Sequence, residues 1–152
     1  LGDVYKRQVI YDADMADVAS VQVHIDGETD LNMELDSENK QYTVNDIDVA
    51  ALGTDAVDAL TTLYDNLTGL TTSTLDLTDN VPMEEEPEIT LTYNLKDGTT
   101  EVITFLAKDK ESYYVLRNGE YSGFLAKRTA FTSRNGILEF YHRLEKTIGM
   151  TE

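Results

Sequence analysis

The two histidines supply the only imidazole groups of the chain, and the sequence contains no cysteine. His24 falls at a polar position of an alternating segment. His142 follows Tyr141, off the apolar stripe of a helical segment. Neither histidine belongs to a Gly-x-Ser-x-Gly or His-Glu-x-x-His pattern, and the lack of cysteine excludes a thiol nucleophile and a thiolate zinc site. We therefore expect two surface histidines and assign no catalytic residue.

Carboxylates are abundant, with 29 Asp and Glu in 152 residues, so some of them cluster by chance. Asp12, Asp14 and Asp17 offer the oxygen ligands that Ca²⁺ prefers, but the segment lacks the glycine and the closing glutamate of an EF-hand loop. The Asp-Gly-Glu-Thr-Asp segment at 26–30 is explained more simply as a turn. A glycosidase needs two carboxyl groups at a fixed separation in a cleft, and no spacing here singles out such a pair. We expect no metal site and no cofactor.

Aromatic and basic side chains gather around a predicted hairpin in the second half of the chain. Aromatic rings on a sheet stack on sugars or on a partner peptide, but they also pair across strands in ordinary sheets. The basic residues Lys127, Arg128 and Arg134 suit an acidic partner, or they balance nearby acids. The predicted interaction surface comprises Tyr113, Tyr114, Tyr121, Phe124, Lys127 and Arg128.

The first half of the chain shows an alternating pattern followed by a helical one. Strands are predicted at 20–25, 31–35 and 41–44. Asp26-Gly27 is typical of a turn between the first two strands. A helix with Thr54 as its N-cap and Gly69 after its end follows. Its apolar face consists of Val57, Leu60, Tyr64 and Leu67.

The second half repeats this order, with one more strand before its helix. Strands are predicted at 89–95, 99–106, 113–117 and 121–126. Asp97-Gly98 and Asn118-Gly119 are typical of tight turns between them. A closing helix has Thr132 or Ser133 as its cap and Gly149 after its end. Its apolar face consists of Ile137, Phe140, Tyr141, Leu144 and Ile148.

Matched spacings indicate that the two halves are repeats. Gly27 precedes Tyr42 by 15 residues (42 − 27), and Gly98 precedes Tyr113 by the same number (113 − 98). We therefore predict an α+β fold of two meander-plus-helix repeats, with antiparallel sheets packed against two amphipathic helices. The expected organisation is a loose acidic lead-in at 1–18, a first repeat at 19–78, an acidic proline-containing linker at 79–87 and a second repeat at 88–149.

The charge balance restricts the class of partner. The 12 Lys and Arg against 29 acids give a formal net charge of −17. Nucleic acid and anionic membrane surfaces are disfavoured as partners, because both bind through cationic side chains. No stretch has the roughly 18–20 apolar residues that cross a bilayer. The opening Leu-Gly-Asp-Val-Tyr-Lys-Arg-Gln resembles translated sequencing-adapter sequence, so we expect residues 1–8 to be non-native and the natural protein to extend upstream.

Two segments together resemble a known protein family. They are Ile-Thr-Leu-Thr-Tyr-Asn-Leu-Lys-Asp-Gly-Thr-Thr at 89–100 and Tyr-Tyr-Val-Leu-Arg-Asn-Gly-Glu at 113–120. This pattern is similar to that of the domain-of-unknown-function 4340 family, in its form from Gram-positive anaerobes, and the resemblance extends over about residues 20–149. It implies a membrane-anchored protein whose domains lie outside the cytoplasm, and some members accompany ABC-transporter components. The family has no established catalytic residues, and the usual N-terminal membrane segment is missing from this chain.

The sequence leads us to expect a non-enzymatic extracytoplasmic binding or assembly module of a membrane-anchored bacterial protein, accessory to an ABC-type transport or envelope system. It would bind a protein or a cell-envelope polymer through a sheet surface or an edge strand. One alternative is a carboxylate-dependent hydrolase acting in a cleft between the repeats. Another is a structural spacer domain of a larger surface protein.

Overall fold

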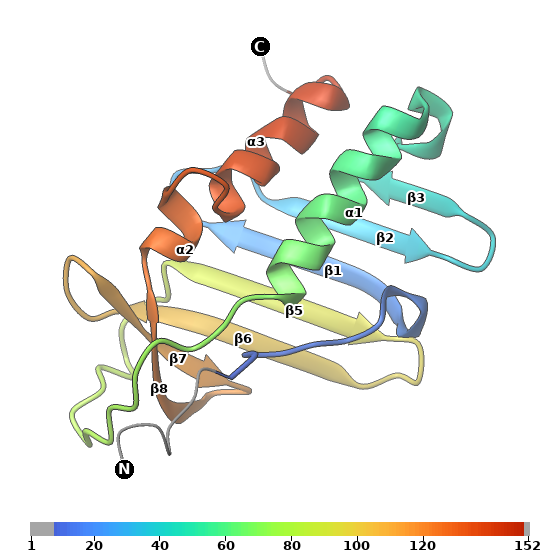
Figure 1. Cartoon of the computed structure of the whole chain (residues 1–152). Coiled ribbons are helices and arrows are strands. Elements are labelled where there is room, and N and C mark those ends of the chain that lie inside the picture. Colours follow the sequence, from blue (N-terminus) through green and yellow to red (C-terminus); the bar gives the residue numbers. More distant parts are fainter. Residues whose placement is uncertain (1–7, 151–152) are drawn as a thin grey trace.

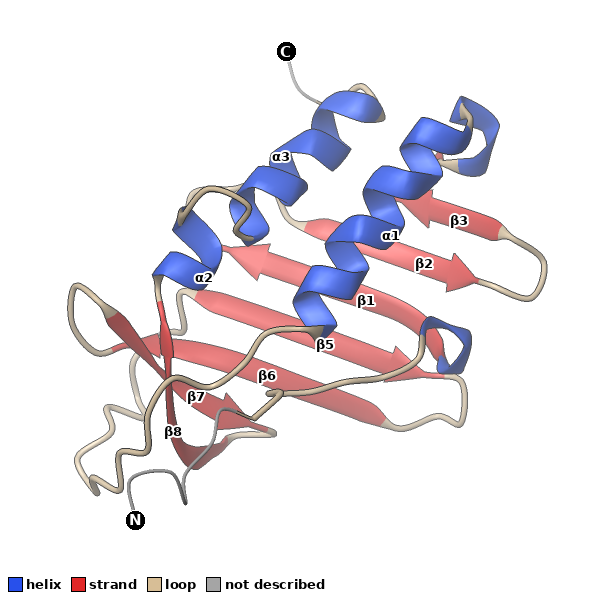
Figure 2. Ribbon diagram, in the orientation of Figure 1, coloured by secondary structure: helices blue, strands red, loops and turns tan. Residues whose placement is uncertain are grey.

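The computed structural model describes residues 8–150. The fold has two layers, a sheet and a layer of helices packed on it. Eight strands form a single antiparallel sheet in the order β4-β3-β2-β1-β5-β6-β7-β8. The helices α1, α2 and α3 all lie on the same face of this sheet (Figure 1, Figure 2). The elements are η1 Met15–Asp17, β1 Val18–Ile25, β2 Leu31–Asp36, β3 Gln41–Val44, β4 Ile47–Asp48, η2 Ala50–Leu52, α1 Thr54–Thr68, β5 Ile89–Leu95, β6 Thr100–Ala107, β7 Ser112–Arg117, β8 Glu120–Lys127, α2 Thr129–Thr132 and α3 Ile137–Thr147.

The predicted α+β class with antiparallel strands and two amphipathic helices is confirmed, with one correction. The strands of both halves join in one sheet, because β1 pairs directly with β5, for example through Val21 and Tyr93. The first half also contains a fourth, two-residue strand, β4, that the sequence pattern did not predict. A single hydrophobic core therefore extends across both halves of the chain.

Strand alternation places one set of side chains under the helices. In β1, Val21, Val23 and Ile25 are buried, and their neighbours Gln22 and His24 point to the other face. A strand alternates faces with a period of two residues, so each strand presents one apolar and one polar side. The helices pack on the apolar side and leave the other side of β1, β2 and β5 without helical cover (Figure 2).

The helices bury most of the apolar faces that their sequences predict, with Val57 and Phe140 only partly buried, but they begin at different residues. Gly53 and Gly136 are the N-caps of α1 and α3, in place of the predicted Thr54 and of Thr132 or Ser133. Thr132 instead ends the separate short helix α2. A Cβ atom on Gly136 would lie 2.8–3.0 Å from three backbone oxygens of the preceding turn, so the tight chain reversal before α3 requires glycine at this position.

The predicted tight turns are confirmed by backbone geometry. Asn118 and Gly119 both have positive φ, 52° and 84°, which is the conformation of a type I′ hairpin turn. Gly27 and Gly98 also have positive φ, at the ends of β1 and β5. These positions explain why glycine follows Asp or Asn in each case.

The segment between α1 and β5 covers one edge of the sheet. Residues 73–76 run beside β8, where Ser73 N donates to the Leu125 carbonyl at 2.8 Å and Asp76 N donates to the Gly123 carbonyl at 2.8 Å. The opposite edge strand, β4, is only two residues long. Both edges are therefore poor templates for adding a strand, which removes support from the expectation that an edge strand binds the partner.

The lead-in is attached to the body of the protein over its described part. The backbone of Ile10 donates to the Leu70 carbonyl at 2.8 Å, and the Tyr64 hydroxyl donates to the Ala13 carbonyl at 2.5 Å. Residues 8–17 are thus held against α1 and the chain that follows it, where a loose segment was expected. The predicted non-native stretch lies outside the described residues, except for Gln8. No helix of the described residues is long and apolar enough to cross a membrane.

Candidate functional site

The six residues of the predicted interaction surface are divided between two faces of the sheet. Tyr113 lies on the helix side and is only 5% exposed, with its ring edge-on to those of Phe105 and Phe131. The Arg128 guanidinium lies 4.4 Å from the centre of the Tyr113 ring, and its Nη1 donates to Glu88 Oε1 at 3.0 Å. Tyr113 therefore packs in the core, as a correction to its expected role on the surface, whereas Arg128 is half-buried at the border of the core.

Tyr114 and Tyr121 lie on the opposite face of the sheet, across β7 and β8. Their rings meet edge to face with centres 5.6 Å apart, and the Tyr121 hydroxyl donates to the Asp76 carbonyl at 2.5 Å. Phe124 sits in β8 opposite Leu75 of the segment that follows α1. These aromatics join strands and attach a loop, as cross-strand pairs do in ordinary sheets.

The basic residues lie around an open hollow at the end of β8. This hollow, of about 500 Å³, is lined by Lys127 and Arg128 together with Lys110 and Glu111. Of these side chains, Lys127 is exposed, and Arg128 is held by Glu88 and by the Asp109 carbonyl. Arg134 is exposed and does not line this hollow.

The uncovered face of the sheet carries a connected network of amide and hydroxyl groups across four strands. Gln22 Nε2 donates to Asn32 Oδ1 at 2.8 Å, and Asn94 Nδ2 donates to Gln22 Oε1 at 2.8 Å and to Ser20 Oγ at 3.0 Å. Thr100 Oγ1 extends this hydrogen-bond network by donating to Asn94 Oδ1 at 3.1 Å. We call Ser20, Gln22, Asn32, Asn94 and Thr100 the polar platform. Because its members fix one another's rotamers, a ligand that binds here orders few side chains.

Two open hollows lie beside the polar platform on the same face. One, of about 450 Å³, is lined by residues of β1, β2 and β3, including Ser20 and Thr43. The other, of about 350 Å³, includes Gln22, His24 and Asn32 together with Thr90 and Thr92 of β5. The platform therefore separates two places where parts of an extended ligand fit.

His24 lies at the border of the second hollow, between two carboxylates. Its Nδ1 is 2.7 Å from Asp30 Oδ1, and its Nε2 is 3.1 Å from Asp26 Oδ1. The hydrogen bond with Asp30 is the main reason that the pKa of His24 is raised above its ordinary value of 6.5. The two carboxylates lie on different sides of the ring, so they do not converge on one nitrogen.

We predict that an NMR titration of the imidazole signals gives a midpoint above 6.5 for His24, and that Asp30→Asn lowers it. Because the pKa of His24 is higher in the folded protein than in the unfolded chain, protonation of His24 stabilises the fold. This stabilisation is fully present at a pH below the unfolded-state pKa of 6.5, and it is lost as the pH rises through the folded-state pKa. The contribution to stability is small, because both partners are well exposed to solvent. A midpoint at or below 6.5 would show that the Asp30 hydrogen bond does not form.

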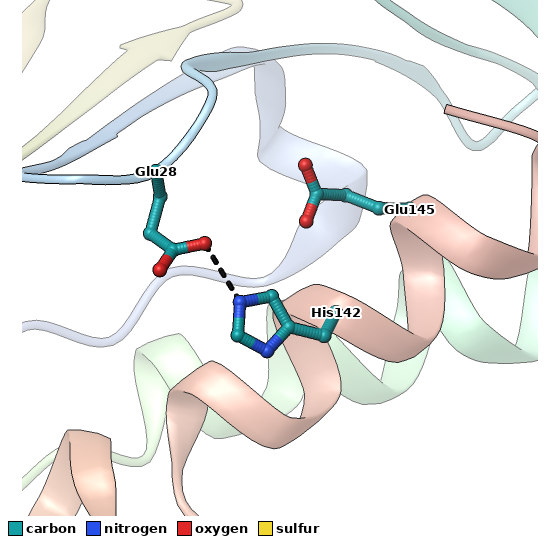
Figure 3. A group of neighbouring side chains, drawn as sticks. All are labelled: Glu28, His142 and Glu145. Atoms are coloured by element: carbon teal, nitrogen blue, oxygen red, sulfur yellow. Dashed lines mark hydrogen bonds and ion pairs between the residues drawn. The ribbon is translucent and has the colours of Figure 1, made fainter. Parts of the chain in front are cut away.

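A second histidine cluster lies on the helix side, where α3 meets the turn between β1 and β2. His142 Nε2 lies 2.7 Å from Glu28 Oε1. Glu145, one helical turn further along α3, directs its carboxylate toward the same space (Figure 3). Ligand atoms of the three residues lie within 4.8 Å of one another, and they are the only such group of three among residues 8–150. The Asp12, Asp14 and Asp17 cluster does not converge in this way, and Asp14 instead caps the short η1 helix.

Glu145 is the unusual member of this cluster. Its side chain is buried, at 5% exposure, and makes no hydrogen bond or ion pair with another described residue. Burial raises the pKa of the Glu145 carboxyl above its ordinary value, His142 acts in the opposite direction, and Glu28 raises it further. The arrangement therefore places the carboxylate of a largely buried side chain beside an imidazole and a second carboxylate.

The sequence contained a partial signal for this cluster. His142 and Glu145 are three residues apart, which places both on one face of a helix, and paired ligands often have this spacing. Nothing local places Glu28 beside them, because it is 114 residues away from His142. The polar platform had a clearer signal, since Ser20, Gln22 and Asn94 occupy the polar positions of alternating strands. A comparison of the chain with family models, curated proteins and solved structures found no match.

Proposed function

We propose that the chain is a non-enzymatic binding or assembly module, and that the uncovered face of the sheet is its ligand surface. The observation that carries the proposal is the polar platform, a fixed set of amide and hydroxyl groups on a face without helical cover. Each platform group has a defined donor or acceptor direction before the ligand arrives. Such preorganisation favours binding because it lowers the entropic cost of ordering the site.

The chemistry of the platform points to a ligand rich in hydroxyl and amide groups. Its five side chains are uncharged, so they match hydroxyls and acetamides better than phosphates or sulfates. The net charge of −17 also repels anionic polymers. We therefore propose a cell-envelope glycan as the ligand, with a partner protein as the alternative that the experiment below distinguishes.

We further propose that the module arose by duplication of a four-strand meander followed by a helix. The sheet order is symmetric about the junction of β1 and β5, with β2 to β4 on one side and β6 to β8 on the other. Val21 pairs with Met33, and the residues 70 positions later, Leu91 and Ile103, pair in the same way (91 − 21 and 103 − 33). Tyr42 and Tyr113 are both buried in the third strand of their halves. Helix α2 has no counterpart in the first half.

We place the module outside the cytoplasm, attached to a bacterial membrane through a segment upstream of this chain and accessory to an ABC-type transport or envelope system. This part of the proposal is supported by the resemblance to the domain-of-unknown-function 4340 family. The residues that carry the resemblance form β5, nearly all of β7 and the turns that follow these two strands.

One observation favours the hydrolase alternative. A carboxyl with a raised pKa beside a second carboxylate is a common feature of acid–base sites, and Glu145 beside Glu28 has this feature. Neither residue, however, lines the two hollows beside the polar platform or the hollow at the end of β8. We therefore prefer the binding module.

The proposal is tested by sedimenting the protein with purified Gram-positive cell-wall sacculi. The double variant Gln22→Thr/Asn94→Thr removes two platform amides and keeps residues that favour strands. We expect about tenfold weaker binding, since each lost hydrogen bond contributes about 0.5–1.5 kcal/mol. Asn80→Thr, which removes an exposed amide outside the sheet, is the matched control and should bind like the wild type.

The other outcomes decide against parts of the proposal. Equal binding by the wild type and the double variant would show that the platform is not the binding surface. No binding of the wild type to sacculi would exclude the glycan and leave a partner protein as the ligand. Release of soluble sugars from the sacculi would support the hydrolase.

A further inference from the structure

We propose that Glu28, His142 and Glu145 form a binding site for one divalent transition-metal ion, of which Zn²⁺ is the best match. The site lies on the helix side of the sheet and is separate from the polar platform (Figure 3). Metal binding at this site can therefore be tested independently of the proposed glycan binding.

The donor set determines the class of ion. One imidazole nitrogen and two carboxylates are ligands that Zn²⁺ and other first-row divalent ions accept, whereas Mg²⁺ and Ca²⁺ prefer sites made of oxygen alone. Three protein ligands leave a fourth tetrahedral position for water or another molecule. The His142 side chain is 52% exposed, so an ion can reach the site from solvent.

The distances fit an ion after small side-chain movements. Zinc–ligand bonds of about 2.0–2.2 Å place neighbouring ligand atoms of a tetrahedral site about 3.4 Å apart. His142 Nε2 and Glu28 Oε1, now 2.7 Å apart, would separate slightly, and Glu145 would approach from within 4.8 Å. No backbone movement is needed, because the long Glu side chains span these differences.

The largely buried side chain of Glu145 supplies the second, independent argument. A carboxylate that is partly removed from water and has no ion-pair partner is less stable than one in water, and a bound cation offsets this cost. Glu145 is aimed into the cluster, and no described residue donates a hydrogen bond to its carboxylate. A metal ion is the partner that its position and direction accommodate.

The fold fixes the two elements that carry the ligands. The Tyr141 hydroxyl donates to the Thr29 carbonyl, which attaches the turn containing Glu28 to α3. Tyr141 is fully buried and adjacent to His142, so this bond holds both elements in register. Tyr141 is thus a positioning residue for the site.

The test is isothermal titration of the tag-free, chelator-treated protein with ZnCl₂ alone. We expect one Zn²⁺ per chain, with affinity at least about tenfold lower in His142→Ala and in Glu145→Gln, since each lacks a ligand. The exposure of His142 and the shape of glutamine keep both variants folded, which circular dichroism checks. His24→Ala is the matched control, because His24 also lies between two carboxylates but without convergence on one nitrogen.

Three results would overturn the proposal. They are the absence of binding, weak binding at several sites that His142→Ala leaves unchanged, and an equal loss of affinity in His24→Ala. A second readout uses the imidazole NMR signals of the wild type. Zn²⁺ should shift those of His142 at one equivalent and leave those of His24 in place, and the reverse pattern would contradict the assignment.

Discussion

Replacing Phe131 with alanine is expected to lower the free energy of unfolding by about 3–5 kcal/mol. Phe131 is 1% exposed, and its ring lies edge-on to Phe105 at 5.2 Å and to Tyr113 at 5.9 Å between ring centres. This triad fixes α2 to the end of the sheet formed by β6 and β7. The truncation leaves a cavity in the core and removes two aromatic contacts, and both effects act in the same direction.

Urea denaturation followed by circular dichroism measures this change. Leu77→Ala is the control, because Leu77 is 78% exposed and its truncation should change stability by less than about 0.5 kcal/mol. Similar losses in the two variants would show that the packing of α2 on the sheet is not as described.

Two buried tyrosines are expected to respond in opposite directions to the loss of their hydroxyl groups. Tyr141→Phe leaves the Thr29 carbonyl without its donor and should cost about 1–3 kcal/mol. Tyr93 has a buried hydroxyl without a hydrogen-bond partner among the described residues, so Tyr93→Phe should be neutral or stabilising by about 1 kcal/mol. The two changes remove the same atom, which makes each variant the control of the other.

The same denaturation experiment measures both variants. Equal destabilisation would mean that the Tyr93 hydroxyl has a partner in solution, and an unchanged Tyr141→Phe would mean that the turn containing Glu28 is not attached through Thr29. Tyr141 also positions the proposed metal site. Tyr141→Phe should weaken Zn²⁺ binding, whereas Tyr93→Phe should not.

The strands and tight turns could be predicted because the residues that determine them are close together in the sequence. Alternation predicts β1 and β5, and the positive φ of Gly98 and Asn118 explains why those residue types mark the turns. The start of α3 was predicted wrongly because Thr132 and Ser133 are good caps. The chain instead ends a short helix at Thr132 and begins the next after Gly136, whose lack of a side chain allows the close backbone contact.

The assembly of the elements could not be predicted from local patterns. Nothing in β1 indicates that its free edge pairs with β5, and nothing in the turn after it indicates contact with α3. The burial of Tyr113 did have a signal, since it alternates with Val115 on the apolar face of β7. Tyr113 was nevertheless a plausible surface residue, because aromatic side chains serve both in cores and in binding sites.

The ligand surface is tested most directly by an NMR titration of the ¹⁵N-labelled protein with soluble glycan fragments released from cell walls. We expect shifts confined to the uncovered face, in the side-chain amides of Gln22, Asn32 and Asn94 and in the backbone of β1, β2 and β5. Those amides report directly on the hydrogen bonds that a ligand would extend. Shifts centred on α1 and α3 or on the β8 edge, or no shifts at millimolar fragment, would contradict the assignment of the polar platform as the binding surface.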